Sequence, residues 1–141
     1  MNLPHVRDVM AKNPVTVDEQ THLSDVLDLM EQRHFKHLPV VQDGKLVGLI
    51  TDRQLRDALP SVLTLSDPAA RRRSLAVTRV GQVCVRDPRV VESSATVLHA
   101  IRIMREIRAG SLPVVADGKL VGILTSGDLI TLLETMLKES H

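Results

Sequence analysis

The stretch His37-Leu38-Pro39-Val40-Val41-Gln42-Asp43-Gly44-Lys45-Leu46-Val47-Gly48-Leu49-Ile50-Thr51 recurs as Ser111-Leu112-Pro113-Val114-Val115-Ala116-Asp117-Gly118-Lys119-Leu120-Val121-Gly122-Ile123-Leu124-Thr125. The two stretches align without a gap at an offset of 74, since residue 37 corresponds to residue 111. In each copy an Asp-Gly pair separates two apolar runs. This pattern is a strong signal for a tight β-hairpin, because both central residues of the turn need positive φ. The chain therefore consists of two copies of one structural unit.

Helical patterns flank each hairpin. In the first copy, apolar residues at helical spacing predict a helix over 22–34, and Asp52 is expected to cap another over 53–59 that stops at Pro60. In the second copy the matching helices run through Val97 and Ile107 and over 126–137. Each unit therefore has the order strand, helix, hairpin, helix. We expect an α/β fold of the α+β type, with two pseudo-symmetric repeats packed sheet to sheet.

The copies set the expected domain organisation: repeat 1 over 1–59, a linker over 60–79 and repeat 2 over 80–141. A unit of about 60 residues buries little surface alone, so the repeats are expected to share a core. In the linker, Asp67-Pro68 marks a helix start, with an N-cap followed by Pro at the first position. The basic run Arg71 to Arg73 is then expected to form an exposed helical turn rather than a nucleic-acid contact.

Composition narrows the possible partners. The chain has 141 residues, a net charge of +1, one Phe and neither Trp nor Tyr, which disfavours nucleic-acid binding. No run approaches the roughly 18 apolar residues of a membrane span, and the N-terminus lacks an apolar signal core. Cys84 is the only cysteine, so no internal disulfide is expected and the residue is expected to pack as a small apolar side chain. We expect a soluble cytoplasmic protein without a membrane or nucleic-acid partner.

The repeated pattern apolar-Pro-Val-Val-x-Asp-Gly-Lys-Leu-Val-Gly-x-x-Thr resembles the CBS domain, and a tandem pair of such domains is called a Bateman module. The resemblance covers about residues 6–59 and 80–137. The stretch from Thr51 to Ser61 looks similar to stand-alone bacterial CBS-pair proteins grouped with acetoin-utilisation regulators. The resemblance implies that an adenosine-containing ligand binds in clefts between the repeats. It also implies a flat homodimer, and a sensing role toward an unknown effector protein rather than catalysis.

The implied ligand is AMP, ADP or ATP, with no cofactor required; S-adenosylmethionine and NAD are alternatives. The nucleotide motif of the family is Gly, two apolar residues, Thr or Ser, two variable residues, then Asp, and the second copy matches it from Gly122 to Asp128. A helix N-terminus offers N–H groups and a positive dipole end to a phosphate. The hydroxyls of Thr125 and Ser126 add polar contacts, and the two acceptor oxygens of Asp128 suit the paired hydroxyls of a ribose.

The first copy departs from this motif, because Gln54 stands where Asp is expected after Thr51. Losing one acceptor toward a ribose diol costs about 0.5–1.5 kcal/mol. The first site is therefore weak, empty or tuned to another ligand. An alternative reading is purely structural: Thr51 with Asp52, and Thr125 with Ser126, simply cap helices.

Further candidate residues follow from the matching family positions. An apolar slot for the base is implied at Thr16, Val17, Pro39, Val90, Val91 and Pro113. These residues also suit a plain sheet core, and both roles can hold together. His34, Lys36 and His37 form a basic cluster that would favour a phosphate, with His37 adding pH sensitivity; the alternative is a solvated helix end.

No catalytic or metal site is expected. The sequence lacks a phosphate-binding Gly-x-x-x-x-Gly-Lys-Ser/Thr loop and a nucleophile elbow, and no Cys or carboxylate nearby completes a ligand set with His34 and His37. The leading hypothesis is an adenine-nucleotide sensor. A ligand-free protein-interaction module, an enzyme and a nucleic-acid-binding regulator are the competing readings.

Overall fold

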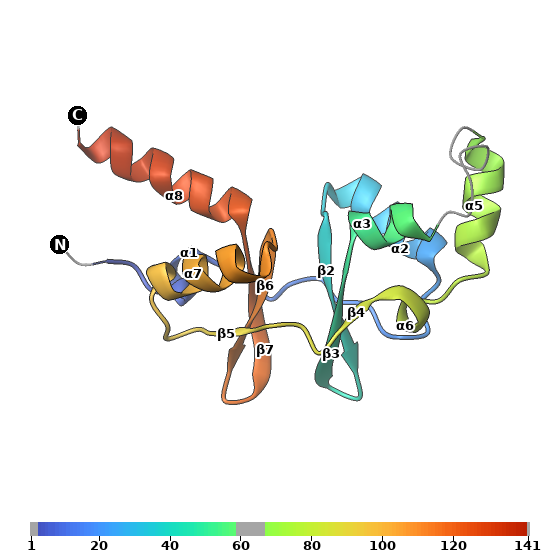
Figure 1. Cartoon of the computed structure of the whole chain (residues 1–141), viewed down its shortest axis with the longest axis horizontal. Helices are drawn as coiled ribbons and strands as arrows, with labels where there is room; N and C mark the ends of the chain where they lie inside the picture. The colour runs from blue at the N-terminus through green and yellow to red at the C-terminus, as the bar shows by residue number, and fades with distance from the viewer. Residues whose placement is uncertain (1–2, 59–66, 141) are drawn as a thin grey trace. The chain divides into compact units, whose positions relative to one another are not determined.

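The computed structural model describes residues 3–58 and 67–140, and these form two compact units. The first unit spans Val15–Asp87, and the second joins the residues up to Pro14 to those from Pro88 onward. The elements of each unit can be followed by label in Figure 1. The sequence repeats were expected to divide at 59 and 80, whereas the compact units divide at 14/15 and 87/88. The N-terminal segment of the chain therefore belongs to the unit that carries the second hairpin.

The first unit is a small sheet with helices packed on it. Its elements are α2 (Leu23–Arg33), β2 (His37–Gln42), β3 (Lys45–Thr51), α3 (Asp52–Asp57), α5 (Pro68–Ala76), α6 (Val80–Val83) and β4 (Val85–Arg86). The strand order is β2-β3-β4, and Val17 forms a parallel bridge with Val40 beside β2. The core contains buried apolar residues from every layer: Val17, Leu23, Val26, Met30, Leu38, Val40, Ile50, Leu55, Leu75 and Val80.

The second unit repeats this plan. Its elements are α1 (Val6–Val9), β1 (Ala11–Lys12), β5 (Val91–Glu92), α7 (Val97–Ile107), β6 (Ser111–Ala116), β7 (Lys119–Thr125) and α8 (Ser126–Glu139). The strand order is β1-β7-β6-β5, with only the β5–β6 pair parallel. Its core also joins helix and sheet residues: Val6, Val91, Ala100, Ile103, Met104, Leu112, Val114 and Leu124. The mixed α/β class and the repeated unit are as the sequence predicted.

The two Asp-Gly pairs form the predicted turns. Asp43 and Gly44 have φ of 52° and 78°, and Asp117 and Gly118 have φ of 52° and 76°. Both central residues of each turn are therefore left-handed, as the tight hairpin requires. Each hairpin pairs in the same register, including a shift in the second half of its first strand.

The predicted helices are present, with small differences at their ends. α2 ends at Arg33 because His34 adopts a left-handed C-cap conformation, with φ of 58°. The assignment of Asp52 as the N-cap of α3 is wrong, because Thr51 is the N-cap and Asp52 is the first helical residue. The predicted end of that helix at residues 59–60 lies outside the described residues. Asp67 caps α5 with Pro68 at the first position, as predicted.

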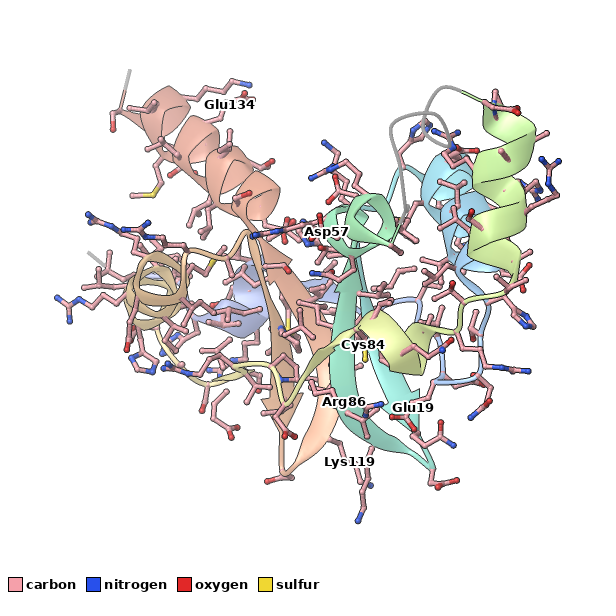
Figure 2. All side chains as sticks on the ribbon, turned by 45° about the vertical axis from the view of Figure 1, so that its right-hand side comes forward. Glu19, Asp57, Cys84, Arg86, Lys119 and Glu134 are labelled. Atoms are coloured by element: carbon pink, nitrogen blue, oxygen red, sulfur yellow. The ribbon has the colours of Figure 1, made fainter. Side chains whose placement is uncertain are left out.

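The linker helix is more than an exposed turn. α5 packs on α2, and Leu75 is buried in the core of the first unit. The Arg72 guanidinium donates to both carboxylate oxygens of Asp28 at 3.0 and 2.8 Å. A second arginine fixes α6: Arg86 donates to Glu19 at 2.6 Å and to the carbonyl of Gly81 at 2.7 Å. Figure 2 shows Arg86 and Glu19 beside each other.

The sequence did not predict that each hairpin sheet receives an edge strand from the other repeat. β1 lies near the start of the first repeat but pairs with β7 of the second hairpin, and β4 lies near the start of the second repeat but pairs with β3 of the first hairpin. Two glycines make these pairings possible. A Cβ at Gly122 would lie 2.5 Å from the sulfur of Met10 and 2.8 Å from the carbonyl oxygen of Ala11. A Cβ at Gly48 would lie 2.9 Å from both Cys84 Sγ and the carbonyl oxygen of Val85.

Over residues 3–58 and 67–140, none of the helices combines the length and the apolar character needed to cross a membrane.

Replacement of Gly122 by Ala is expected to destabilise the fold, because the new methyl group meets backbone that cannot move without breaking the β1–β7 pairing. Overpacking of this kind costs about 1–3 kcal/mol. Urea denaturation followed by circular dichroism measures the loss. Gly127→Ala is the matched control, since its Cβ would meet only Thr125 Oγ1 at an ordinary 3.6 Å. Equal midpoints for wild type and Gly122→Ala would contradict the assigned close approach.

Candidate functional site

The start of α8 carries the candidate residues of the second repeat. Thr125 is the N-cap, and its N–H and hydroxyl both donate to Asp128 Oδ2, at 2.8 and 3.1 Å. The N–H of Asp128 donates back to Thr125 Oγ1 at 3.3 Å. This reciprocal capping box satisfies two backbone donors and fixes the Asp128 carboxylate. Asp128 is half-buried, whereas Ser126 and Gly127 are exposed.

The start of α3 is built in the same way. The N–H and the hydroxyl of Thr51 both donate to Gln54 Oε1 at 2.7 Å. Thus the capping role, considered as the structural alternative, is filled in both repeats. Thr51 and Thr125 cap the helices, while Asp52 instead pairs with Arg56 at 3.1 Å.

The two boxes differ in what remains for a ligand. Once Oδ2 accepts from Thr125, Asp128 retains a second carboxylate oxygen, which has no hydrogen-bond partner within the described part of the chain. Once Oε1 accepts from Thr51, Gln54 retains only its amide NH2, which is a donor. The second repeat therefore presents a charged acceptor at the helix start, and the first presents a neutral donor.

The helix N-terminus offers less to a phosphate than its sequence implied. The N–H of Ser126 donates to the carbonyl of Gly110 at 2.9 Å, and the N–H groups of Thr125 and Asp128 are used in the capping box. Among the described residues, this leaves the N–H of Gly127 and the hydroxyl of Ser126 as donors of the first turn.

The adjoining sheet places the proline and valine candidates on different faces. Along β6, Leu112 and Val114 point into the helix-side core, so Pro113 points to the opposite face, about 7 Å along the strand from Ser111, which pairs with Thr125. Val91 lies in the helix-side core, whereas its neighbour Val90 is exposed. Pro113 therefore lies on the same face of the sheet as Thr125, whereas Val91 is part of the core.

The first unit shows the same division. Val17 belongs to the helix-side core, Thr16 is exposed, and Pro39 is buried on the opposite face of β2. The N–H of Val17 donates to the carbonyl of Pro39 at 3.1 Å, and the N–H of Val41 donates to that of Val17 at 2.8 Å. The candidates for the apolar slot are therefore neighbours through the backbone, although their side chains diverge.

The basic cluster is split by burial. His34 and Lys36 are exposed, but His37 is half-buried at the start of β2, opposite Thr51. The Nδ1 atom of His37 is buried without a hydrogen-bond partner in the described residues. Burial lowers the pKa of His37; the Asp52 carboxylate opposes this, and the charge on Lys36 adds to it. His37 is consequently neutral near pH 7.

The lowered pKa of His37 predicts a loss of stability in mild acid. Below about pH 6.5 the unfolded chain takes up a proton on this residue before the folded chain does, so the free energy of unfolding falls as the pH drops. Urea denaturation at about pH 7 and about pH 5.5 measures the change. His37→Gln is expected to reduce this fall, whereas the control His99→Gln, at an exposed position, is not. An equal fall in wild type and His37→Gln would contradict the prediction.

Comparison with known proteins identifies the repeated unit. The CBS domain family matches residues 6–61 and 80–135. A CBS domain-containing protein of Dictyostelium discoideum is 33% identical over 135 residues, covering 94% of this chain and 93% of that protein. The crystal structure of a putative acetoin utilization protein, AcuB, from Vibrio cholerae is 30% identical, with a TM-score of 0.79 and coverage of 97% and 95%. CBSX2 of Arabidopsis thaliana, solved in complex with AMP, is 30% identical, with a TM-score of 0.75 and coverage of 94% and 97%. The chain therefore belongs to the CBS domain family and contains two CBS domains in tandem.

Proposed function

We propose that this protein is a sensor that binds an adenosine-containing nucleotide, AMP, ADP or ATP, at the start of α8. The observation that supports the proposal is that the two carboxylate oxygens of Asp128 have different roles. One oxygen is fixed by Thr125 in the capping box, and the other is held in place without a partner in the described residues. A fixed carboxylate acceptor suits the vicinal hydroxyls of a ribose.

The similarity to CBSX2 supports the choice of ligand, because that protein was solved in complex with AMP and is 30% identical to this chain. We propose that the base contacts two apolar residues: Pro113, on the same face of the sheet as Thr125, and the exposed Val90. In the first unit, Thr51, Gln54, His37, Pro39 and Thr16 form the weaker counterpart, because Gln54 presents a donor where Asp128 presents an acceptor.

A sensing role requires that the ligand distinguish two states of the protein. A nucleotide shifts a conformational balance only by its difference in affinity for the two states. We propose that an effector protein reads that balance and that the chain itself catalyses no reaction.

The carboxylate can be tested without disturbing the helix cap. Asp128→Asn retains an oxygen for Thr125 but replaces the remaining acceptor with a donor. We expect AMP to bind about tenfold more weakly to this variant, while the unfolding midpoint without ligand stays close to that of wild type. Isothermal titration calorimetry measures the affinity for AMP, and a thermal-shift series compares AMP, ADP, ATP, NAD and S-adenosylmethionine.

Gln54→Glu is the matched control, because it leaves an acceptor at α3 and does not touch α8. Its affinity for AMP is expected to equal or exceed that of wild type. A loss of binding in Gln54→Glu with none in Asp128→Asn would place the main site in the other repeat. The absence of any thermal shift at millimolar nucleotide would reject the nucleotide sensor.

The outer face of α8 supports a second proposal, a homodimer. The helix has no buried residue, and Ile130, Leu133 and Leu137 are 66%, 54% and 55% exposed at positions i, i+3 and i+7. A continuous apolar stripe of this kind is typical of a helix that packs against a partner. We propose that a second copy of the chain covers it through a twofold contact, in which the same helix of both copies takes part.

Leu133→Lys is expected to convert the dimer to a monomer, because it places a charge in the middle of the stripe. Analytical ultracentrifugation of wild type and variant over a range of concentrations measures the change. Val77→Lys is the control, since Val77 is a 79% exposed apolar residue in the first unit. A wild-type protein that sediments as a monomer at every concentration would reject the dimer.

A further inference from the structure

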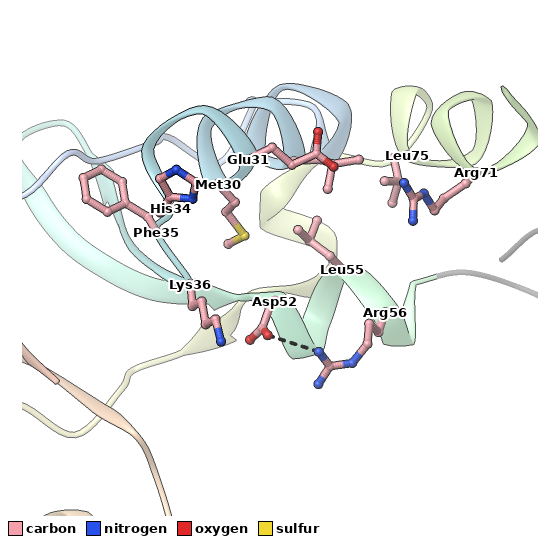
Figure 3. A pocket seen from close by; sticks show the side chains of 11 residues that line it. Met30, Glu31, His34, Phe35, Lys36, Asp52, Leu55, Arg56, Arg71 and Leu75 are labelled. Atoms are coloured by element: carbon pink, nitrogen blue, oxygen red, sulfur yellow. Dashed lines mark hydrogen bonds and ion pairs between the residues drawn. The ribbon is translucent and has the colours of Figure 1, made fainter. Parts of the chain in front are cut away.

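The first unit contains a pocket of about 450 Å³ between α2, α3 and α5, shown in Figure 3. Its apolar surface is formed by Leu27, Met30, Phe35, Leu55 and Leu75. Met30, Leu55 and Leu75 belong to the buried core, so this part of the wall is held by the fold. Phe35 is 37% exposed and is the only aromatic residue of the chain besides histidine. The volume lies in the range of pockets that hold small organic molecules.

The rim of the pocket carries more positive than negative charge. Lys36, Arg56 and Arg71 line it together with the two carboxylates Glu31 and Asp52. Asp52 is already paired with Arg56 at 3.1 Å, as the dashed line in Figure 3 marks. Glu31 is thus the one remaining rim carboxylate, against the two cations Lys36 and Arg71. The sixth polar rim residue, His34, is exposed.

The side chain of Arg71 is partly buried and is a candidate for pairing with an anion. Its Nε is buried and has no hydrogen-bond partner among the described residues. The adjacent Arg72 on the same helix donates twice to Asp28 at 3.0 and 2.8 Å. A buried N–H of a guanidinium left unpaired is unfavourable, and a carboxylate is one of the anions that pair strongly with it.

The pocket shares no capping-box residue with the candidate nucleotide site, although His34 and Lys36 of the basic cluster line it. On α3, Thr51 and Gln54 form the capping box, whereas Asp52, Leu55 and Arg56 lie on another face of the helix and line the pocket. The lining also differs between the repeats, because Ala109, Gly110 and Ile130 stand where the first repeat has Phe35, Lys36 and Arg56.

We propose that this pocket binds a small amphipathic carboxylate. Its apolar body lies against Phe35 and Met30, and its head group pairs with Arg71, with Lys36 adding attraction at the rim. This site does not depend on the adenosine proposal, because the two share no residue of the capping boxes.

Two residues report directly on the pocket in the full-length protein. Phe35 carries the only phenyl ring of the chain, and selective labelling of Phe separates its ring signals from those of the 6 histidines. The methyl group of Met30 has an internal control in Met104, its counterpart in the second repeat. Titration with octanoate is expected to shift the signals of Phe35 and Met30 and to leave Met104 unchanged. Octylammonium, which has the same chain and the opposite charge, is expected to cause no such shift.

Charge variants then test the assigned head-group contact. Arg71→Gln is expected to weaken octanoate binding about tenfold, and Lys36→Gln is expected to weaken it less. Arg73→Gln is the matched control, since Arg73 is exposed on the same helix and does not line the pocket. Unchanged methyl signals of Leu38 and Ile50, in the core of the first unit, verify that each variant is folded there.

Three results would overturn the proposal. The first is no shift of Phe35 or Met30 up to the solubility limit of octanoate. The second is equal binding of octanoate and octylammonium. The third is a change of both signals with protein concentration alone, in step with sedimentation, because a second copy of the chain would then cover the groove. A parallel AMP titration gives its own result at Asp128, so failure of either site leaves the other testable.

Discussion

The fold depends on close backbone packing at two glycines that lack a Cβ. Gly48 and Gly122 lie where a Cβ would collide with backbone carbonyls of the segments that enter as edge strands. Because these glycines admit β4 and β1, each hairpin sheet is completed by a strand that comes from beyond its own repeat. Met10 and Cys84 occupy equivalent positions at the offset of 74, so the same close packing is repeated in both units. The helix starts that carry the candidate site follow directly from these sheets, since β3 and β7 run into Thr51 and Thr125.

The start of each final helix combines a structural and a chemical role. A side chain three residues after the threonine must offer one acceptor to the cap. Gln54 meets this need and has only donors left, whereas Asp128 meets it with half of its carboxylate. Capping and ligand binding are therefore not competing explanations of the motif. The cap fixes the geometry of the group, and the identity of the side chain determines what it presents outward.

Local patterns predicted the elements well, because their causes are local. The Asp-Gly turns, the helices after each short extended run and the start of α5 follow from φ preferences, apolar spacing and capping. The N-cap of α3 was misplaced by one residue, because Asp52 and Thr51 are both good caps and the reach of Gln54 decides between them. The exchange of β1 and β4 was missed because two-residue strands leave almost no periodic signal. The glycine at equivalent positions of both hairpins was the available clue, since a strand interior otherwise disfavours it. The faces of Val17 and Val91 and the buried Nε of Arg71 depend on tertiary contacts and could not be read from spacing.

The exchanged edge strands also have a consequence for the evolution of such a chain by duplication. The segment that was duplicated, as the offset of 74 marks it, is not the segment that folds into one compact body. A gene encoding a single copy would yield a chain whose hairpin sheet receives its edge from another molecule, or from its own leading segment folded back. In a fused pair of copies the edge strands come from the same chain, and each repeat supplies one strand to the sheet of the other. Genetic recombination within this family is therefore expected to preserve pairs of repeats rather than shuffle single ones.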